Sequence, residues 1–345
     1  MPAEYRSHAP TPGLTHRYFD RVLFLTTDRC PVYCRHCTRS YAVGPATAQV
    51  VKRSMAPGKE RWDAALRYVA ERPEVEDVVV SGGDVFRLRP DQLQSIGSRL
   101  LAIAHVRRIR FATRGIAVQP MRVLSDPAWV GVLTELAASG RAQGKEVSVH
   151  THFNHPREVS WITQDAAAVL FAHGIPVRNL SVILRKVNDD PATQIELARR
   201  LAYMNIRPYY TYACDLVASL EDLRVPLWRC MEIEKVVRGA LTGHHTPVFV
   251  VDVPGGGGKR DLHSFEHYDR ETGISLYTAP SVRPGEIFAY VDPLRDLSPD
   301  VAAAWAREDG RAQMLERAVG SAGFRMTDLA TDLLARQEHN HGGRR

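Results

Sequence analysis

The sequence predicts an α/β fold in which an open or closed partial (β/α)6 barrel precedes a C-terminal extension. Apolar runs of strand length alternate with segments of helical period between residues 22 and 212. Repeated β-α units of this kind favour parallel strands joined by right-handed crossovers. The apolar runs are continuous, which is typical of strands that helices cover. In such a barrel the chemistry is expected at the carboxyl ends of the strands.

The individual elements follow from the positions of these runs. The expected strands are 22–27, 78–80, 108–113, 147–150, 181–184 and 208–212. The expected helices are 61–71, a helix after residue 90, 126–138, 163–172 and 192–204. Beyond residue 226 we expect a helix at 231–241, a strand at 247–252 and further short strands. The predicted parts are an arm (1–15), the barrel (16–225), an extension (226–300), a helical segment (301–337) and a polar tail (338–345).

Composition and charge exclude several classes of protein. Of the 345 residues, 44% are hydrophobic and 24% are charged, which argues against intrinsic disorder. The formal charge of +6 comes from basic residues scattered among acidic ones, whereas a nucleic-acid-binding surface needs a basic stripe. The same charge suits a site for anionic cofactors. No apolar stretch resembles a signal peptide or a membrane span, so we expect a cytoplasmic protein.

The cysteines are clustered, and this clustering is not typical of the disulfide framework of a secreted protein. Of the five cysteines, Cys30, Cys34 and Cys37 form a CxxxCxxC loop directly after the first expected strand. Three thiolates on a [4Fe–4S] cluster leave one iron open, and that iron can chelate the amino and carboxylate groups of S-adenosylmethionine. The alternative is a zinc site that also uses His36, although adjacent His36 and Cys37 can hardly both bind one tetrahedral ion.

The second expected strand ends in Ser81-Gly82-Gly83-Asp84. Glycines at such a position let the backbone approach a ligand closely. We expect these residues to contact the amine of S-adenosylmethionine, the alternative being an ordinary turn at the end of a strand.

Four consecutive glycines precede Lys259, just after the expected strand 247–252. A phosphate-binding Walker loop is excluded because Arg260, not Ser or Thr, follows the lysine. The glycines could act as a hinge that brings the lysine amine into a closed site, where it forms a Schiff base with pyridoxal phosphate. The alternative is a flexible, exposed loop.

With these three features the chain resembles the lysine 2,3-aminomutase family, whose members use a radical S-adenosylmethionine mechanism and pyridoxal phosphate. The resemblance extends from about residue 12 to residue 293. The matching segments are HRYFDRVLFLTTDRC, CRHCTR, SGGD, THFNHP, SVILRKVNDD, RPYYTYACDL and VVDVPGGGGK. The resemblance implies a radical S-adenosylmethionine barrel with an extension that carries the pyridoxal-phosphate lysine.

The resemblance also implies a role for each matching residue. The implied catalytic residues are Lys259, as the pyridoxal-phosphate lysine, and Cys30, Cys34 and Cys37, as the cluster ligands. The implied S-adenosylmethionine contacts are Ser81, Gly82, Gly83, Asp84 and His152, to which His36 could be added. The implied pyridoxal-phosphate contacts are Arg17, Tyr18, Arg21 and Tyr212. The implied substrate contacts are Arg39, Asp215 and Asp252.

The two aspartates indicate the class of substrate. Buried carboxylates that converge on one pocket repel each other unless a cation enters between them. The substrate side chain is therefore expected to carry an ammonium or a guanidinium group, and lysine and arginine remain open. Arg39 suits the substrate carboxylate because its guanidinium can bind both oxygens.

The activity implied is the transfer of the α-amino group of a free basic L-amino acid to its β-carbon. A second hypothesis is an enzyme that uses the same cofactors but desaturates, epimerises or oxidises the basic amino acid. It rests on Leu180, which stands where the family has a glutamine near S-adenosylmethionine. A third hypothesis is a non-catalytic iron–sulfur protein, which would not need Arg39, Asp215, Asp252 and Lys259 together.

The expected partners are a small amino acid and an electron donor such as a flavodoxin or a ferredoxin, without nucleic acid or membrane. The chain could form a homo-oligomer. Two differences between this sequence and the family, however, put the tetramer that the family forms in doubt for this chain. Only residues 1–15 precede the HRY segment, where the family has a long helical extension. No cysteine follows Cys230, so the family's C-terminal zinc is not expected.

Overall fold

The computed structural model describes residues 9–46, 52, 55–217 and 220–330. It divides into two compact units. The first holds Tyr5–Ser181 and Glu196–Tyr209, and the second holds Val182–Ile195 and Tyr210–Arg345. The polar tail and parts of the expected arm and C-terminal helix (1–8 and 331–337) lie outside the described residues.

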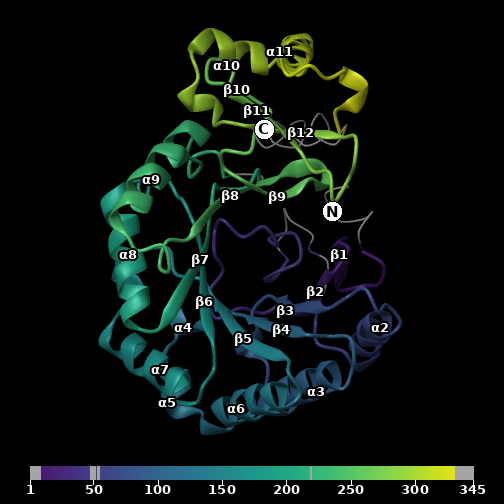
Figure 1. Cartoon of the computed structure of the whole chain (residues 1–345), viewed down its shortest axis with the longest axis vertical. Helices are drawn as coiled ribbons and strands as arrows, with labels where there is room; N and C mark the ends of the chain where they lie inside the picture. The colour runs from purple at the N-terminus through teal and green to yellow at the C-terminus, as the bar shows by residue number, and fades with distance from the viewer. Residues whose placement is uncertain (1–8, 47–51, 53–54, 218–219, 331–345) are drawn as a thin grey trace. The chain divides into compact units, whose positions relative to one another are not determined.

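Nine strands form one sheet, hydrogen-bonded in the order in which they occur in the chain. They are β1 (Leu14–Tyr18), β2 (Arg21–Thr27), β3 (Asp77–Gly82), β4 (Arg108–Ala112), β5 (Glu146–Thr151), β6 (Val177–Val182), β7 (Ile206–Tyr212), β8 (Val248–Val253) and β9 (Gly258–Asp261). The pairs from β2 to β6 and the pair β7–β8 are parallel, whereas β1–β2 and β8–β9 are antiparallel. The predicted α/β class and the partial barrel are confirmed (Figure 1).

Three details of the sheet differ from the prediction. All six expected strands exist, but β6 begins at Val177 because its buried residues alternate with half-buried ones and form no continuous apolar run. Strand β1 was not expected. It forms a hairpin with β2, in which Tyr18 is opposite Arg21. Strand β8 was assigned to the extension, yet it pairs with β7 in the same sheet.

In the first unit, helices cover one face of the sheet (Figure 1). They are α2 (Lys59–Ala70), α3 (Pro90–Leu101), α4 (Gly115–Val118), α5 (Met121–Ser125), α6 (Pro127–Ala142), α7 (Trp161–Ala172) and the larger part of α8 (Pro191–Tyr203). Local sequence determines where the helices begin: the Asp126 carboxylate accepts the Trp129 N–H, and Ser160 caps α7 in the same way. None of the helices in the described residues combines the length and apolar character needed to cross a bilayer.

The other face of this sheet is polar. Val78, Val80 and their neighbours belong to the helix-covered core, so the alternate residues point to the opposite side. On that side Arg110 pairs with Asp77 at 2.8 Å. His150, which is 4% exposed, lies on the same side.

The second unit contains a separate antiparallel sheet of β10 (His267–Asp269), β11 (Ile274–Thr278) and β12 (Ile287–Val291). Helices α10 (Pro299–Trp305) and α11 (Glu308–Ser321) share a core with these strands, and α9 (Leu227–Ala240) packs in a second core with β8. In the described part of the expected helical segment, residues 301–330, the chain forms two short helices. The chain leaves the helical path after Trp305 and again after Ser321.

Candidate active site

The cysteine loop follows β2 and is closed by a hydrogen bond from the Gly44 N–H to the Asp28 carbonyl, at 2.9 Å. All three thiols are free and half-buried. Burial, followed by the charges of Asp84, Cys37 and Cys34, raises the pKa of Cys30 to about 12. The three sulfurs are therefore within electrostatic reach of one another. In the described part of the chain, no three His, Cys, Asp or Glu side chains already stand in a metal-binding arrangement.

The two glycines after Ser81 are required by the cysteine loop itself. Gly82 has φ +127°, and a Cβ on it would lie 2.3 Å from the Thr27 carbonyl oxygen. A Cβ on Gly83 would lie 2.3 Å from the Arg29 carbonyl oxygen. Because this backbone packs directly against the start of the loop, the glycines position Cys30. The contact of these residues with S-adenosylmethionine stays a prediction.

Asp84 has a structural role. Its buried carboxylate accepts the N–H groups of Phe86 at 2.8 Å and of Arg114 at 2.7 Å. Burial raises the pKa of Asp84, and these hydrogen bonds oppose the rise. Asp84 therefore joins the end of β3 to the segment after β4. Its contact with S-adenosylmethionine stays a prediction.

His152 lies in a small cluster of polar side chains at the end of β5. Its Nδ1 is 2.7 Å from the Leu180 carbonyl oxygen, so this nitrogen carries the proton and donates it. Its Nε2 is 3.0 Å from Nε2 of His36 and 3.1 Å from Nδ2 of Asn154. Burial and then the charge of Arg114 lower the pKa of His36 to about 4, and burial, followed by His36, lowers that of His152 well below its usual value. Both imidazoles are neutral at pH 7.

Two residues near the loop were not predicted. Nη1 of Arg114 lies 3.1 Å from Sγ of Cys34, and its Nη2 donates to Oε1 of Glu158 at 2.5 Å. Arg114 follows the carboxyl end of β4, which is where functional residues of parallel strands gather. No sequence motif marks this arginine, so its position after a strand is the feature that could have indicated a role for it.

Arg39, the predicted partner of the substrate carboxylate, lies two residues after Cys37. Its Nε is buried and has no hydrogen-bond partner among the described residues. Its charge lowers the pKa of Cys30 and of Asp84, so it lies near both. An unsatisfied buried guanidinium N–H is costly unless a ligand accepts it.

The predicted pyridoxal-phosphate contacts of the first unit are on the β1–β2 hairpin. The guanidinium carbon of Arg21 lies 4.0 Å from the centre of the Tyr18 ring, and Arg17 precedes Tyr18 on β1. This hairpin presents two arginines and two aromatic rings, Tyr18 and Phe19, within five residues. Such a set suits a phosphate group attached to an aromatic ring.

The second unit brings together Lys259, Asp252, Asp215 and Tyr212. Lys259 and Asp252 are paired across β8 and β9, with Nζ 3.7 Å from Oδ2. Nζ is also 5.8 Å from the centre of the Tyr212 ring. Burial raises the pKa of Tyr212, as do Asp252 and Asp215, whereas Lys259 lowers it. The lysine, both aspartates and the tyrosine thus share one electrostatic environment.

The glycine loop before Lys259 is buried, so the alternative of an exposed loop was wrong, whereas its action as a hinge stays a prediction. All four glycines are buried. Gly255, Gly256 and Gly258 have φ values of +79°, +99° and +73°, and a Cβ on Gly257 would lie 2.5 Å from Cγ2 of Val253. This tight turn reverses the chain from β8 into β9, and it is what places Lys259 opposite Asp252.

The residues of each unit match the chemistry of the groups that the sequence predicts. Three soft thiol donors on one loop suit an iron–sulfur cluster. A primary amine beside a half-buried tyrosine ring suits an aldehyde cofactor with an aromatic ring. The donors for the cluster are in the first unit, and the amine is in the second.

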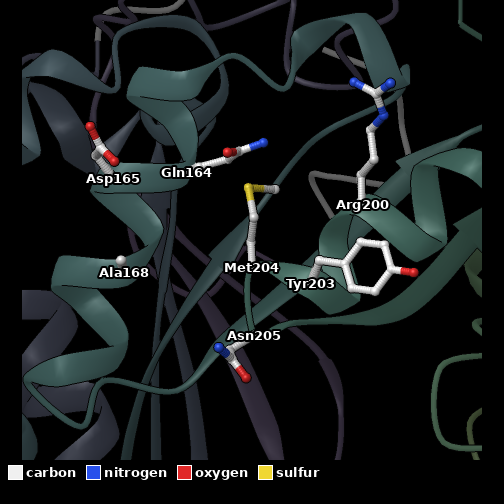
Figure 2. Close-up of a pocket in the computed structure, with 7 residues that line it drawn as sticks. All are labelled: Gln164, Asp165, Ala168, Arg200, Tyr203, Met204 and Asn205. Atoms are coloured by element: carbon white, nitrogen blue, oxygen red, sulfur yellow. The ribbon is translucent and has the colours of Figure 1, made fainter.

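A surface pocket of about 370 Å³ lies apart from these residues, in the first unit. Figure 2 shows that its lining comes from α7 and from the end of α8. The lining residues are Gln164, Asp165, Ala168, Arg200, Tyr203, Met204 and Asn205. It contains none of the predicted site residues.

No family model matches the sequence, but curated proteins do. The chain is 41% identical over 251 residues to the L-lysine 2,3-aminomutase of Fusobacterium nucleatum, which is 73% of this chain and 55% of that protein. It is 40% identical over 258 residues to the L-lysine 2,3-aminomutase of Clostridium subterminale, covering 75% and 58%. It is 31% identical over 262 residues to the glutamate 2,3-aminomutase of Clostridioides difficile, covering 76% and 58%. The chain thus spans little more than half the length of these relatives.

Two solved structures are more distant. A radical SAM methyltransferase from Sphaerobacter thermophilus has 19% identity and a TM-score of 0.42, over 70% of this chain and 69% of that one. The structure described as native anSMEcpe with bound AdoMet has 9% identity and a TM-score of 0.48, over 84% of this chain and 81% of that one.

Proposed function

Because this chain belongs to the lysine 2,3-aminomutase family, we propose that it moves the α-amino group of a free basic L-amino acid, lysine or arginine, to the β-carbon. The observation that carries the proposal is the ion pair between Lys259 and Asp252, at 3.7 Å. A primary ammonium on a linear stem already lies beside one of the two carboxylates that would hold the substrate side chain.

The substrate class follows from charge. Asp252 and Asp215 both act on the Tyr212 hydroxyl, so two acidic groups lie close together in the second unit. An anionic side chain such as that of glutamate would add a third negative charge, whereas an ammonium or a guanidinium would neutralise the pair. In the first unit, the unsatisfied Nε of Arg39 suits a carboxylate such as that of an amino acid.

The proposed cofactors are a [4Fe–4S] cluster on Cys30, Cys34 and Cys37, S-adenosylmethionine near Ser81–Asp84 and His152, and pyridoxal phosphate on Lys259. When bound, the cluster and S-adenosylmethionine would supply the one-electron chemistry that removes a hydrogen atom, and pyridoxal phosphate would supply the aldehyde that carries the migrating nitrogen. The chain's own part is to bind and orient: Arg17, Tyr18 and Arg21 suit the phosphate and the ring, and Tyr212 lies beside the lysine amine. An electron donor such as a flavodoxin or ferredoxin would reduce the cluster.

The neutral state of His152 fits this assignment. With Nδ1–H donated to the Leu180 carbonyl, Nε2 is an acceptor, and the Asn154 amide lies 3.1 Å from it. An ammonium group that binds to Nε2 would take the place of this amide. The Leu180 side chain itself offers no polar group where the family has a glutamine. This difference keeps a second outcome open, in which the same cofactors desaturate, epimerise or oxidise the amino acid.

Anaerobic incubation of the reconstituted, reduced protein with L-lysine, L-arginine or L-glutamate tests the proposal. We expect the β-amino isomer of lysine or arginine, none from glutamate, and catalytic rather than stoichiometric use of S-adenosylmethionine. Stoichiometric consumption with a dehydrogenated or inverted product would support the second outcome. The mutase proposal fails if 5′-deoxyadenosine accumulates while neither basic amino acid is isomerised.

The role of Lys259 can be tested apart from turnover. Lys259→Ala should abolish the visible absorbance of bound pyridoxal phosphate and its trapping by borohydride, because no other amine replaces the Schiff base. The matched control is Lys235→Ala, which removes an exposed lysine on α9 of the same unit. Equal cofactor trapping in the two variants would show that Lys259 is not the attachment site.

A further inference from the structure

Arg114 connects the cysteine loop to a segment far from it in sequence. Its Nη1 lies 3.1 Å from Sγ of Cys34, and its Nη2 donates a 2.5 Å hydrogen bond to Oε1 of Glu158. The Arg114 and Glu158 side chains are 18% and 21% exposed, so water screens this pair only in part. A guanidinium N–H directed at a sulfur stabilises negative charge on that sulfur.

The position of Arg114 is determined by the protein around it. Its backbone N–H donates to Oδ2 of the buried Asp84 at 2.7 Å. Oε2 of Glu158 accepts the Asn154 N–H at 2.6 Å, so both carboxylate oxygens of Glu158 are in use. Three strand ends, those of β3, β4 and β5, thus hold the arginine against Cys34.

Building on the proposed function, in which Cys30, Cys34 and Cys37 hold the cluster, we propose that Arg114 is a positioning residue that raises the reduction potential of that cluster through its hydrogen bond to Cys34. Reduction adds one electron to the cluster, and part of the added charge resides on the ligand sulfurs. Hydrogen bonds to those sulfurs are one of the factors that determine cluster potentials, and a cationic donor favours the reduced form. The electron comes from an external one-electron reductant, and no bond to the arginine forms or breaks.

The test is a redox titration of the iron-loaded protein with titanium(III) citrate, followed by electron paramagnetic resonance without added amino acid. Arg114→Gln should shift the reduction equilibrium at least tenfold toward the oxidised form, which is about 59 mV for a one-electron couple. The matched control is Arg122→Gln. Arg122 is 19% exposed and pairs with Asp126 at 3.0 Å, and it belongs to the same unit. The Arg122→Gln variant should have the same cluster reduction potential as the wild type.

Two further variants separate charge from simple misfolding of the loop. Glu158→Gln keeps an oxygen that can accept a hydrogen bond from Arg114, but it removes the negative charge that offsets the positive charge of the arginine. The reduction equilibrium of the cluster should therefore move toward the reduced form. Arg114→Lys keeps the charge and should recover at least half of the shift. A purely structural role would move the Arg114→Gln and Glu158→Gln variants in the same direction.

The inference is overturned if Arg114→Gln, with a full complement of iron, titrates like Arg122→Gln. If Arg114→Gln does not bind a cluster, Glu158→Gln and Arg114→Lys test the inference in its place. Wild-type reduction potentials in both of these variants overturn the inference. A wild-type protein that assembles no cluster would instead contradict the proposed function. Product formation is not measured, so the two failures are distinguishable.

Discussion

Asp252 and Lys259 face each other on the antiparallel strands β8 and β9, with Nζ of the lysine 3.7 Å from Oδ2 of the aspartate. The register of the two strands creates this pair. The turn of four buried glycines leaves that register little freedom. If Lys259 carries pyridoxal phosphate, as we propose, its amine would no longer compete for Asp252, and the carboxylate would be available to a cation of the substrate.

The first prediction concerns Asp252. Asp252→Asn should raise the KM for lysine at least tenfold, because a hydrogen bond to a charged group contributes about 1.5–3 kcal/mol. The measurement is steady-state kinetics of lysine isomerisation. Asp261→Asn is the control, since Asp261 is an exposed residue of the same hairpin whose carboxylate accepts the local His263 N–H. Equal KM values in both variants would contradict a substrate role for Asp252.

The second prediction concerns the packing of the glycine turn. Gly257 has an ordinary φ of −64°, but an added Cβ would lie 2.5 Å from Val253 Cγ2 and 2.6 Å from Phe288 Cγ. Gly257→Ala should therefore lower stability by about 1–3 kcal/mol through overpacking. Thermal unfolding followed by circular dichroism measures the change.

A suitable comparison for that variant is Gly239→Ala, in helix α9 of the same unit. No atom lies within 4 Å of the added Cβ there, so helix propensity should raise stability by up to about 1 kcal/mol. If Gly257→Ala melts at or above the wild-type temperature, the turn is looser than the structure indicates.

The third prediction concerns His150 on the polar face of the sheet. Burial, together with Arg110 and Arg178, lowers the pKa of His150 to about 3. Since the unfolded side chain titrates near 6.5, the unfolded state binds more protons between pH 6.5 and pH 3, and stability falls as the pH falls through this window. His150 should account for about 2 kcal/mol of that loss at pH 5.

Urea unfolding at pH 7.5 and pH 5.0 tests this contribution. The loss of stability between the two pH values should be about 2 kcal/mol smaller in His150→Gln than in the wild type. His244→Gln, at an exposed position, should leave the difference unchanged. An unaltered pH dependence in His150→Gln would mean that His150 is protonated in the folded protein at pH 5.

Local patterns in the sequence predicted most of the secondary structure and the site residues that lie in motifs. The apolar period located all six strands of the expected barrel, because the face of each strand that the helices cover must be apolar. It misplaced β6, where Arg178 and Asn179 interrupt the apolar run. It also missed β1, because the hairpin with β2 depends on pairing and its residues are mostly polar.

The site residues outside motifs could not be predicted for a related reason. Arg114 contacts Cys34 across 80 positions of sequence and Glu158 across 44, and neither contact has a local pattern. The glycines of the two loops illustrate the same limit. A run of glycines is compatible with flexibility, with contact to a ligand or with close packing, and only the neighbouring atoms distinguish these cases.

The sequence by itself determined the fold class, the thiol donors of the cysteine loop and the lysine amine, because each depends on residue types at short spacing. Tertiary structure decided which partners these groups have. The ends of β3, β4 and β5 bring Asp84, Arg114 and Glu158 to the loop, and the register of β8 and β9 brings Asp252 to Lys259. The physical reason is that charge and hydrogen bonding act over a few ångströms in space, and the chain reaches those distances only when its strands are paired.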